Sequence, residues 1–277
     1  SLNPKSLNSS FIRDYGASIY INVVFLLTTY IYIAILLDSS MKIENDTLEI
    51  QERDIEQQLV RHQGNKIFSD ALNNSSLDTI VPLLVNYISF NRLFGAGVTS
   101  LSSQLSTKSN LFRDEKESPL SRDRSMEVAA SIFVAGIDEY GDTSLNNRPT
   151  HRILAQATMK ALTAYRNYTL KEVDKLEKSL DTSRIDSEVL AGYGAKADNL
   201  ETELFNAVGF HIGSEFLADK EFVILDKQLN AKYPDLVEYL KNAKVSVSGK
   251  EIPAYHWVKI HTSVEEDHFE YALHAAN

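Results

Sequence analysis

The segment 199–233, NLETELFNAVGFHIGSEFLADKEFVILDKQLNAKY, most constrains the fold, because no proline interrupts it before the Tyr233–Pro234 pair. The pattern predicts one long helix. The following proline predicts its end, since a residue before proline avoids the helical backbone region. A long helix with many apolar side chains needs other helices to pack against. We therefore expect a helical framework built around this segment.

Most of the remaining chain also has helical character, strand-like alternation is scarce, and no internal repeat is present. Residues 106–125 are polar and charged and are predicted to be an exposed linker, while 245–252 are predicted to form a turn or small hairpin. The predicted fold class is an all-α bundle of about seven or eight helices. The other predicted helical segments are 44–72, 77–105 (one helix or a helix pair), 126–141, a helix opened by Pro149 and a last helix opened by Pro253.

The composition excludes several classes of site. The formal net charge of −10 disfavours nucleic acid as a partner, because phosphate binding needs a positive field. The 277-residue chain has no cysteine, which excludes disulfides, thiolate zinc sites, iron–sulfur clusters and cysteine nucleophiles. A bound metal would have to be held by His, Asp and Glu, and this donor set favours iron or manganese.

Residues 16–37, GASIYINVVFLLTTYIYIAILL, form an uncharged apolar stretch that is long enough to cross a bilayer. Three interpretations stay open: a membrane anchor, a non-native or upstream-translated extension ahead of Met41, and a buried helix or strand. We expect an apolar extension at 1–40 and a helical domain at 41–277. The expected location is the cytoplasm, with membrane contact if residues 16–37 insert into a bilayer.

The C-terminal motif HTSVEEDH begins at His261 and contains two histidines and three acids. On a helix, His261, Glu265 and His268 would share one face beside the apolar stripe that starts at Trp257. Burying a carboxylate and two imidazoles without partners is costly. The motif is therefore interpreted either as a hydrogen-bonded network in the core or as part of a transition-metal site.

Two other places put acids and histidines beside apolar faces. His211 and Glu215 are four residues apart on the long helix, and Glu139 ends one helix shortly before His151 opens the next. Taken separately, the first is typical of a hydrogen-bonded pair and the second of exposed helix ends. Combined with the C-terminal motif, they offer three carboxylates and three imidazoles, which suit two iron ions that share a carboxylate. The candidate metal ligands are Glu139, His151, Glu215, His261, Glu265 and His268.

Three segments carry a family resemblance: IDEYGD followed by a histidine, GSEF followed by EF, and IHTSVEEDH. In this order they resemble the haem-oxygenase-like diiron oxidases, specifically the CADD-like branch, over roughly residues 85–275. The resemblance implies a haem-oxygenase-like bundle with the same six residues as ligands. Family members often have Asp at the position of Glu265. The interval from Glu139 to His151 is longer than in the tightest members, which keeps Asp138 as an alternative first ligand.

The resemblance implies a non-haem diiron oxidase or oxygenase in which two Fe(II)/Fe(III) ions activate O₂ to oxidise a small organic substrate. Known members act on amino acids, fatty acids or aromatic precursors, and Phe90, Phe94 or Phe210 would contact the substrate. An external electron donor and a second copy of the chain are further partners to consider. Two alternatives stay open. One is a cofactor-independent oxidase on the same fold, whose histidines bind substrate, and the other is a non-catalytic helical interaction protein.

Overall fold

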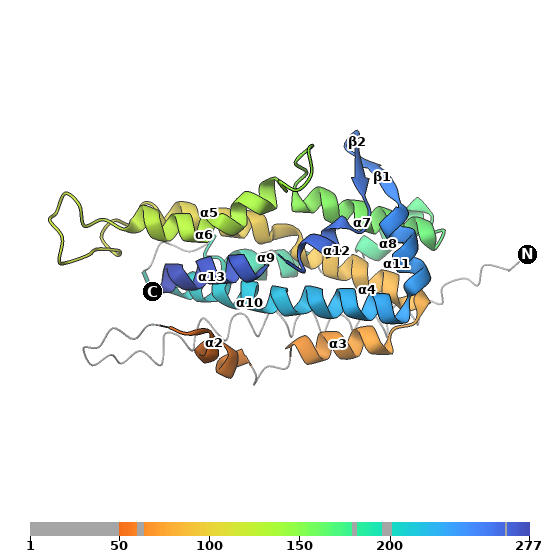
Figure 1. The fold of residues 1–277 in the computed structure, drawn as a ribbon, viewed down its shortest axis with the longest axis horizontal. Helices are drawn as coiled ribbons and strands as arrows, with labels where there is room; N and C mark the ends of the chain where they lie inside the picture. The colour runs from red at the N-terminus through yellow and green to blue at the C-terminus, as the bar shows by residue number, and fades with distance from the viewer. Residues whose placement is uncertain (1–49, 60–63, 179–181, 196–200, 264) are drawn as a thin grey trace, which may run out of the picture.

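The helices form an elongated bundle, shown in Figure 1. In the described part of the chain one two-stranded sheet accompanies them, and the all-α prediction is confirmed. The predicted extension at 1–40, with its apolar stretch 16–37, lies outside the described residues. Among the helices of the described part, none has the length and apolar character that a membrane crossing requires. The computed structural model describes residues 50–277 except 60–63, 179–181, 196–200 and 264.

The described part contains more helices than the seven or eight predicted. The segment 44–72 contains two helices, 77–105 is the helix pair that the prediction allowed, the last predicted helix is in two parts, and the helices at 182–192 and 234–242 were not predicted. The elements are α2 (Glu52–Leu59), α3 (Gly64–Asn74), α4 (Leu77–Phe90), η2 (Asn91–Leu93), α5 (Phe94–Leu105), α6 (Ser125–Tyr140), α7 (His151–Tyr165), α8 (Leu170–Lys178), α9 (Thr182–Gly192), α10 (Glu201–Lys232), α11 (Pro234–Asn242), β1 (Lys244–Val247), β2 (Lys250–Pro253), α12 (His256–Ile260) and α13 (Glu265–Ala276).

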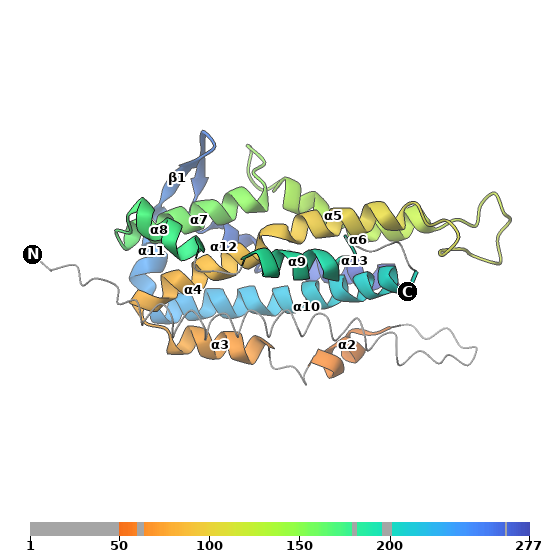
Figure 2. The ribbon, with the colours of Figure 1, turned by 180° about the vertical axis from the view of Figure 1, so that it is seen from behind.

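The long helix α10 runs along the length of the bundle in both views (Figure 1, Figure 2). It confirms the predicted helix and ends at Lys232, directly before Tyr233–Pro234. Every residue from Ala207 to Leu217 is buried, because α3, α5, α12 and α13 all pack against α10. Polar side chains in such a fully surrounded stretch need partners, since leaving them unpaired is costly. The buried His211 and Glu215 of α10 therefore need polar partners from the helices around them.

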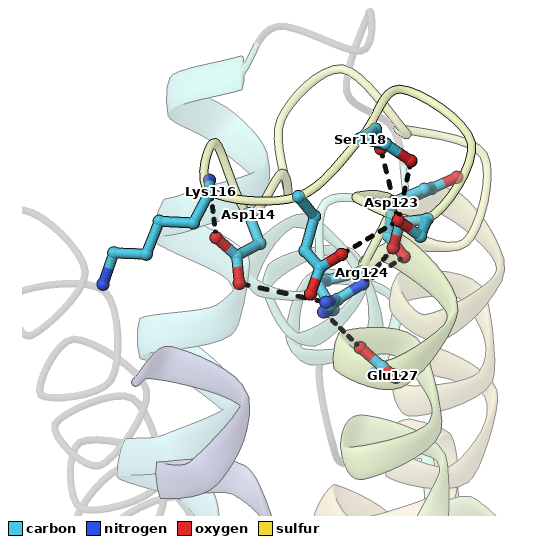
Figure 3. A network of polar contacts seen from close by, with 8 residues as sticks. Asp114, Lys116, Ser118, Asp123, Arg124 and Glu127 are labelled. Carbon is cyan, nitrogen blue, oxygen red and sulfur yellow. Dashed lines mark hydrogen bonds and ion pairs between the residues drawn. The ribbon is translucent and has the colours of Figure 1, made fainter.

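Residues 106–124 connect α5 to α6 and are mostly exposed, as predicted, but a polar network organises them (Figure 3). Arg124 forms ion pairs with Asp114 (Nη2–Oδ2 3.9 Å) and Glu127 (Nε–Oε2 3.2 Å). The backbone N–H of Asp114 donates to the carbonyl oxygen of Arg122 at 2.9 Å. Ion pairs at exposed side chains add little stability, so this network shapes the connection more than it stabilises the bundle.

The C-terminal region departs from the prediction of one continuous helix. β1 and β2 form the predicted small hairpin, with Ser248 and Gly249 at positive φ (50° and 75°) in its turn. Positive φ at both turn positions matches the twist of the two strands. Pro253 is the last residue of β2, so the prediction that it opens the last helix is wrong. The helical backbone begins only at His256.

The last helix is also interrupted between α12 and α13. The hydroxyl of Thr262 donates to the carbonyl oxygen of Lys259 (2.7 Å), and that of Ser263 donates to the carbonyl oxygen of Ile260 (3.0 Å). Hydroxyl groups that bond to nearby carbonyls compete with the backbone pairing that would continue a helix. His261 consequently follows the end of α12 while His268 lies in α13, and the single helical face predicted for HTSVEEDH is wrong.

Candidate metal centre

Five helices deliver acids and histidines to one region of the bundle interior. Three of these residues stand at the break between α6 and α7, two lie on α10, and two flank the break between α12 and α13. The full set comprises Asp138 and Glu139 at the end of α6, His151 at the start of α7, His211 and Glu215 in α10, His261 after α12 and His268 in α13.

Glu139, His151 and His261 form the first group. One ligand atom from each lies within 4.8 Å of the others, so the three could hold one metal ion. His151 Nδ1 is 3.3 Å from Glu139 Oε1, and the rings of His151 and His261 are 4.6 Å apart. His261 Nδ1 is 2.7 Å from the carbonyl oxygen of Trp257. That carbonyl can only accept, so Nδ1 carries the proton and Nε2 is left as the metal-binding nitrogen.

Glu215 and His268 form a second group, together with Asp138 and His211. Glu215 lies between two imidazoles, with Oε1 3.2 Å from His211 Nδ1 and Oε2 3.6 Å from His268 Nδ1. The other nitrogen of His268, Nε2, is 3.0 Å from Asp138 Oδ2. The neighbouring acids Asp138 and Glu139 thus divide between the two groups. Asp138 lies beside His268, whereas Glu139 lies beside His151.

The two groups face a common space. Glu139, Glu215, His261 and His268 line one cavity of about 40 Å³. His151 lines a neighbouring cavity of about 30 Å³ together with Glu139 and His261. Five of the six predicted ligands are therefore brought together. The side chain of the sixth, Glu265, lies outside the described part of the structure, and only its place as the first residue of α13 is known.

The protonation states suit metal binding. Burial, together with nearby His151, holds the pKa of His261 well below its usual value, so its imidazole is neutral at pH 7. Burial likewise lowers the pKa of His211. The hydrogen bond with His268 lowers the pKa of Asp138, which keeps this carboxyl ionised. Neutral imidazoles and ionised carboxylates are the forms that coordinate metals.

Glu139 is held close to α5 by a glycine. A Cβ added to Gly95 would lie 3.0 Å from the Cβ of Glu139 and 3.1 Å from its Oε2. Real Cβ atoms rarely approach other atoms this closely, so the absence of a side chain at Gly95 gives the carboxylate its room. A lone glycine in a helical sequence gave no indication of this role.

His151 is positioned by the loop between α6 and α7. Thr150 caps α7, because its side-chain hydroxyl oxygen accepts a hydrogen bond from the backbone N–H of Ile153 at 3.2 Å. The buried carboxylate of Asp142 is 2.6 Å from His256 Nε2, which anchors the loop to the start of α12. This anchored loop accounts for the long interval between Glu139 and His151. The pattern D-E-Y-G-D marks the helix end, but the partner of Asp142 is far away in the chain and could not be deduced from it.

Of the aromatic residues predicted to contact substrate, Phe90 and Phe94 line the 40 Å³ cavity. Phe210 is not among its lining residues and packs against Tyr193, with ring centroids 5.0 Å apart. Comparisons with protein-family models, curated proteins and solved structures find no match to this chain. The site must therefore be interpreted from its own residues.

Proposed function

We propose that this protein is a non-haem diiron oxidase or oxygenase that uses O₂ to oxidise a small organic substrate. The observation that carries the proposal is the convergence of Glu139, His151 and His261 with Glu215 and His268 around a buried cavity. These residues come from helices far apart in the chain. Mutual burial of so many ionisable groups is costly unless a bound ion compensates for it.

The donor set fits iron. It consists of carboxylate oxygens and imidazole nitrogens, which suit iron or manganese. Glu139, His151 and His261 would hold one ion, and Asp138, Glu215 and His268 would hold the other. Carboxylate oxygens of Glu139 and Glu215 lie 3.2 to 3.6 Å from imidazole nitrogens. A metal ion could bind between an ionised carboxylate and a neutral imidazole placed in this way.

When bound, two ferrous ions would supply electrons to O₂. The chain itself provides binding, orientation and exclusion of water. The Trp257 carbonyl fixes the orientation of the His261 ring, and Asp142 fixes the loop that carries His151. His151, His261 and His268 are each at most 4% exposed, so bulk water is kept away from the reacting space.

Iron loading tests the proposal directly. The full chain is incubated with Fe(II) under anaerobic conditions, freed of excess metal, analysed for iron, and then mixed with O₂ while its visible absorption is recorded. We expect about two irons per chain, from the two ligand groups, and a transient visible band after O₂ addition.

The matched control compares two histidines of α13. His268→Ala should lose iron, while His274→Ala should keep it, because His274 is exposed on the same helix. Wild-type protein without metal uptake contradicts the proposal and favours a non-catalytic helical protein. Oxidation of substrate by metal-free protein would favour a cofactor-independent oxidase. Uptake of manganese but not iron would contradict the choice of metal.

A further inference from the structure

Glu221 is a buried carboxyl group that the proposed metal centre does not use. It lies on α10, six residues after Glu215, and is 2% exposed. It nevertheless lines the same cavity as Glu215, His261 and His268. The sequence weakly indicated that Glu221 is buried, because it lies on the same flank of α10 as the apolar Phe210 and Leu217.

The two oxygens of Glu221 have different surroundings. Oε2 accepts a hydrogen bond from the hydroxyl of Tyr87 at 3.0 Å. Oε1 is buried and has no hydrogen-bond partner among the described residues. Buried polar atoms in folded proteins are almost always paired. An unpaired carboxyl oxygen at a cavity wall therefore points to a ligand that supplies a donor.

Tyr87 holds this carboxyl group in one orientation. Its ring stacks on Phe68 with centroids 4.8 Å apart, and it contacts Phe222 at 5.7 Å and Trp257 at 6.0 Å. A side chain enclosed by three other rings cannot swing away without opening the core. Oε1 is thus a preorganised acceptor, and no folding change is required before a donor binds it.

The chemistry of the cavity selects the kind of donor. Phe90, Phe94 and Phe222 contribute aromatic walls, and Phe90 and Phe94 meet edge to face at 5.2 Å. A carboxylate beside aromatic rings is the combination that binds ammonium groups, through a charge-assisted hydrogen bond and cation–π attraction. Burial raises the pKa of Glu221 to about 7, so a cationic partner would favour the ionised form at neutral pH.

We propose that Glu221 is the recognition residue for a small primary amine, whose ammonium group donates to Oε1. A volume of about 40 Å³ holds on the order of three water molecules, so it admits the ammonium head and the first carbons. The rest of the amine would extend past Phe94, which is only partly buried. That this amine is the substrate of the oxidase rests on the proposed function, whereas its binding does not.

The test measures binding without turnover. The full chain, with and without Fe(II), is titrated with n-butylamine, n-butanol and butyrate by calorimetry and by thermal denaturation. We expect n-butylamine to bind and to raise Tm, and the two other probes to bind at least tenfold more weakly. Glu221→Gln should weaken amine binding at least tenfold. Tyr87→Phe should weaken it severalfold, because Oε2 loses its donor and the carboxyl group its orientation.

One control variant locates the effect. Glu238→Gln removes an exposed carboxylate on α11 and should leave amine binding unchanged. Equal binding of n-butanol and n-butylamine, wild-type affinity in Glu221→Gln, or the same loss of affinity in Glu238→Gln as in Glu221→Gln would each overturn the inference. Circular dichroism confirms that each variant is folded. Glu221-dependent amine binding in protein that takes up no iron would sustain this inference while the oxidase proposal fails.

Discussion

The carboxylates that line the central cavity have different partners. Glu139 and Glu215 lie beside imidazoles from three helices. Glu221 accepts a hydrogen bond from the hydroxyl of Tyr87, and aromatic rings line the cavity beside it. Acids that face neutral bases form a donor set for a cation bound between them. An acid that faces aromatic rings can accept a hydrogen bond from a ligand. This difference in partners is the reason why we propose a metal site for Glu139 and Glu215 and ligand recognition for Glu221.

The largest expected effect concerns metal binding by Glu139, Glu215 and the histidines beside them. His261→Ala or Glu215→Ala should reduce iron affinity more than about a hundredfold, which exceeds the effect of removing an outer-shell partner. Helical content should be unchanged, since each variant removes one side chain from a large core. Metal analysis after equilibrium dialysis measures the first effect, and far-ultraviolet circular dichroism the second. Unchanged iron stoichiometry in either variant would refute the assignment of these ligands.

The pH dependence of stability tests how the fold treats the carboxyl group of Glu221. Burial raises the pKa of Glu221 from 4.5 to about 7. Between pH 4.5 and 7 the unfolded chain has released this proton while the folded chain retains it. The free energy of unfolding therefore falls as pH rises through this window, by about 3 kcal/mol, and this contribution is constant above it.

Glu221→Gln should remove that decrease, because an amide does not titrate. Urea denaturation of metal-free protein at pH 5 and pH 7.5 gives the two free energies, and Glu238→Gln serves as the exposed control. The variant should therefore gain stability relative to wild type as the pH is raised. An identical pH dependence in wild type and Glu221→Gln would show that this carboxyl group is not held neutral by the fold.

A smaller effect is expected where a glycine makes room for a ligand. Gly95→Ala places a methyl group about 3 Å from Glu139, so the carboxylate must shift from its position beside His151. We expect about a tenfold loss of iron affinity and a change in unfolding free energy within about 1 kcal/mol, since alanine is also the better helix former. The neighbouring exposed position supplies the control, Ala96→Gly, which should leave iron binding unchanged.

The smallest effect is expected where charges are exposed. Arg124 connects Asp114 and Glu127 at the end of the bundle (Figure 3). Arg124→Ala should change the free energy of unfolding by less than about 1 kcal/mol and leave iron loading intact, because solvent screens these pairs. Chemical denaturation measures this. If Arg124→Ala lowered the free energy of unfolding by several kcal/mol, the exposed ion pairs would contribute to stability as strongly as buried charges.

Part of the candidate site could be predicted from the sequence, because its residues interrupt an apolar pattern. Glu139, His151, Glu215, His261 and His268 occupy positions where apolar residues are expected, and a local pattern makes that visible. Asp138, Gly95 and the pair of Asp142 with His256 acquire their roles from contacts across the bundle. The break after His261 depends on two hydroxyl side chains and a preceding hairpin, and helical periodicity alone did not reveal it.

By itself, the sequence determined the helical class, the long helix α10 with its end at Pro234, the small hairpin, and the residue types available to bind a metal. These follow from interactions within a few residues of one another. Only the tertiary structure decided that Asp138 and Glu139 lie beside different histidines, and that Glu221 lines the cavity with one oxygen that has no partner among the described residues. Those features depend on how helices distant in the chain pack, and packing is a property of the whole core.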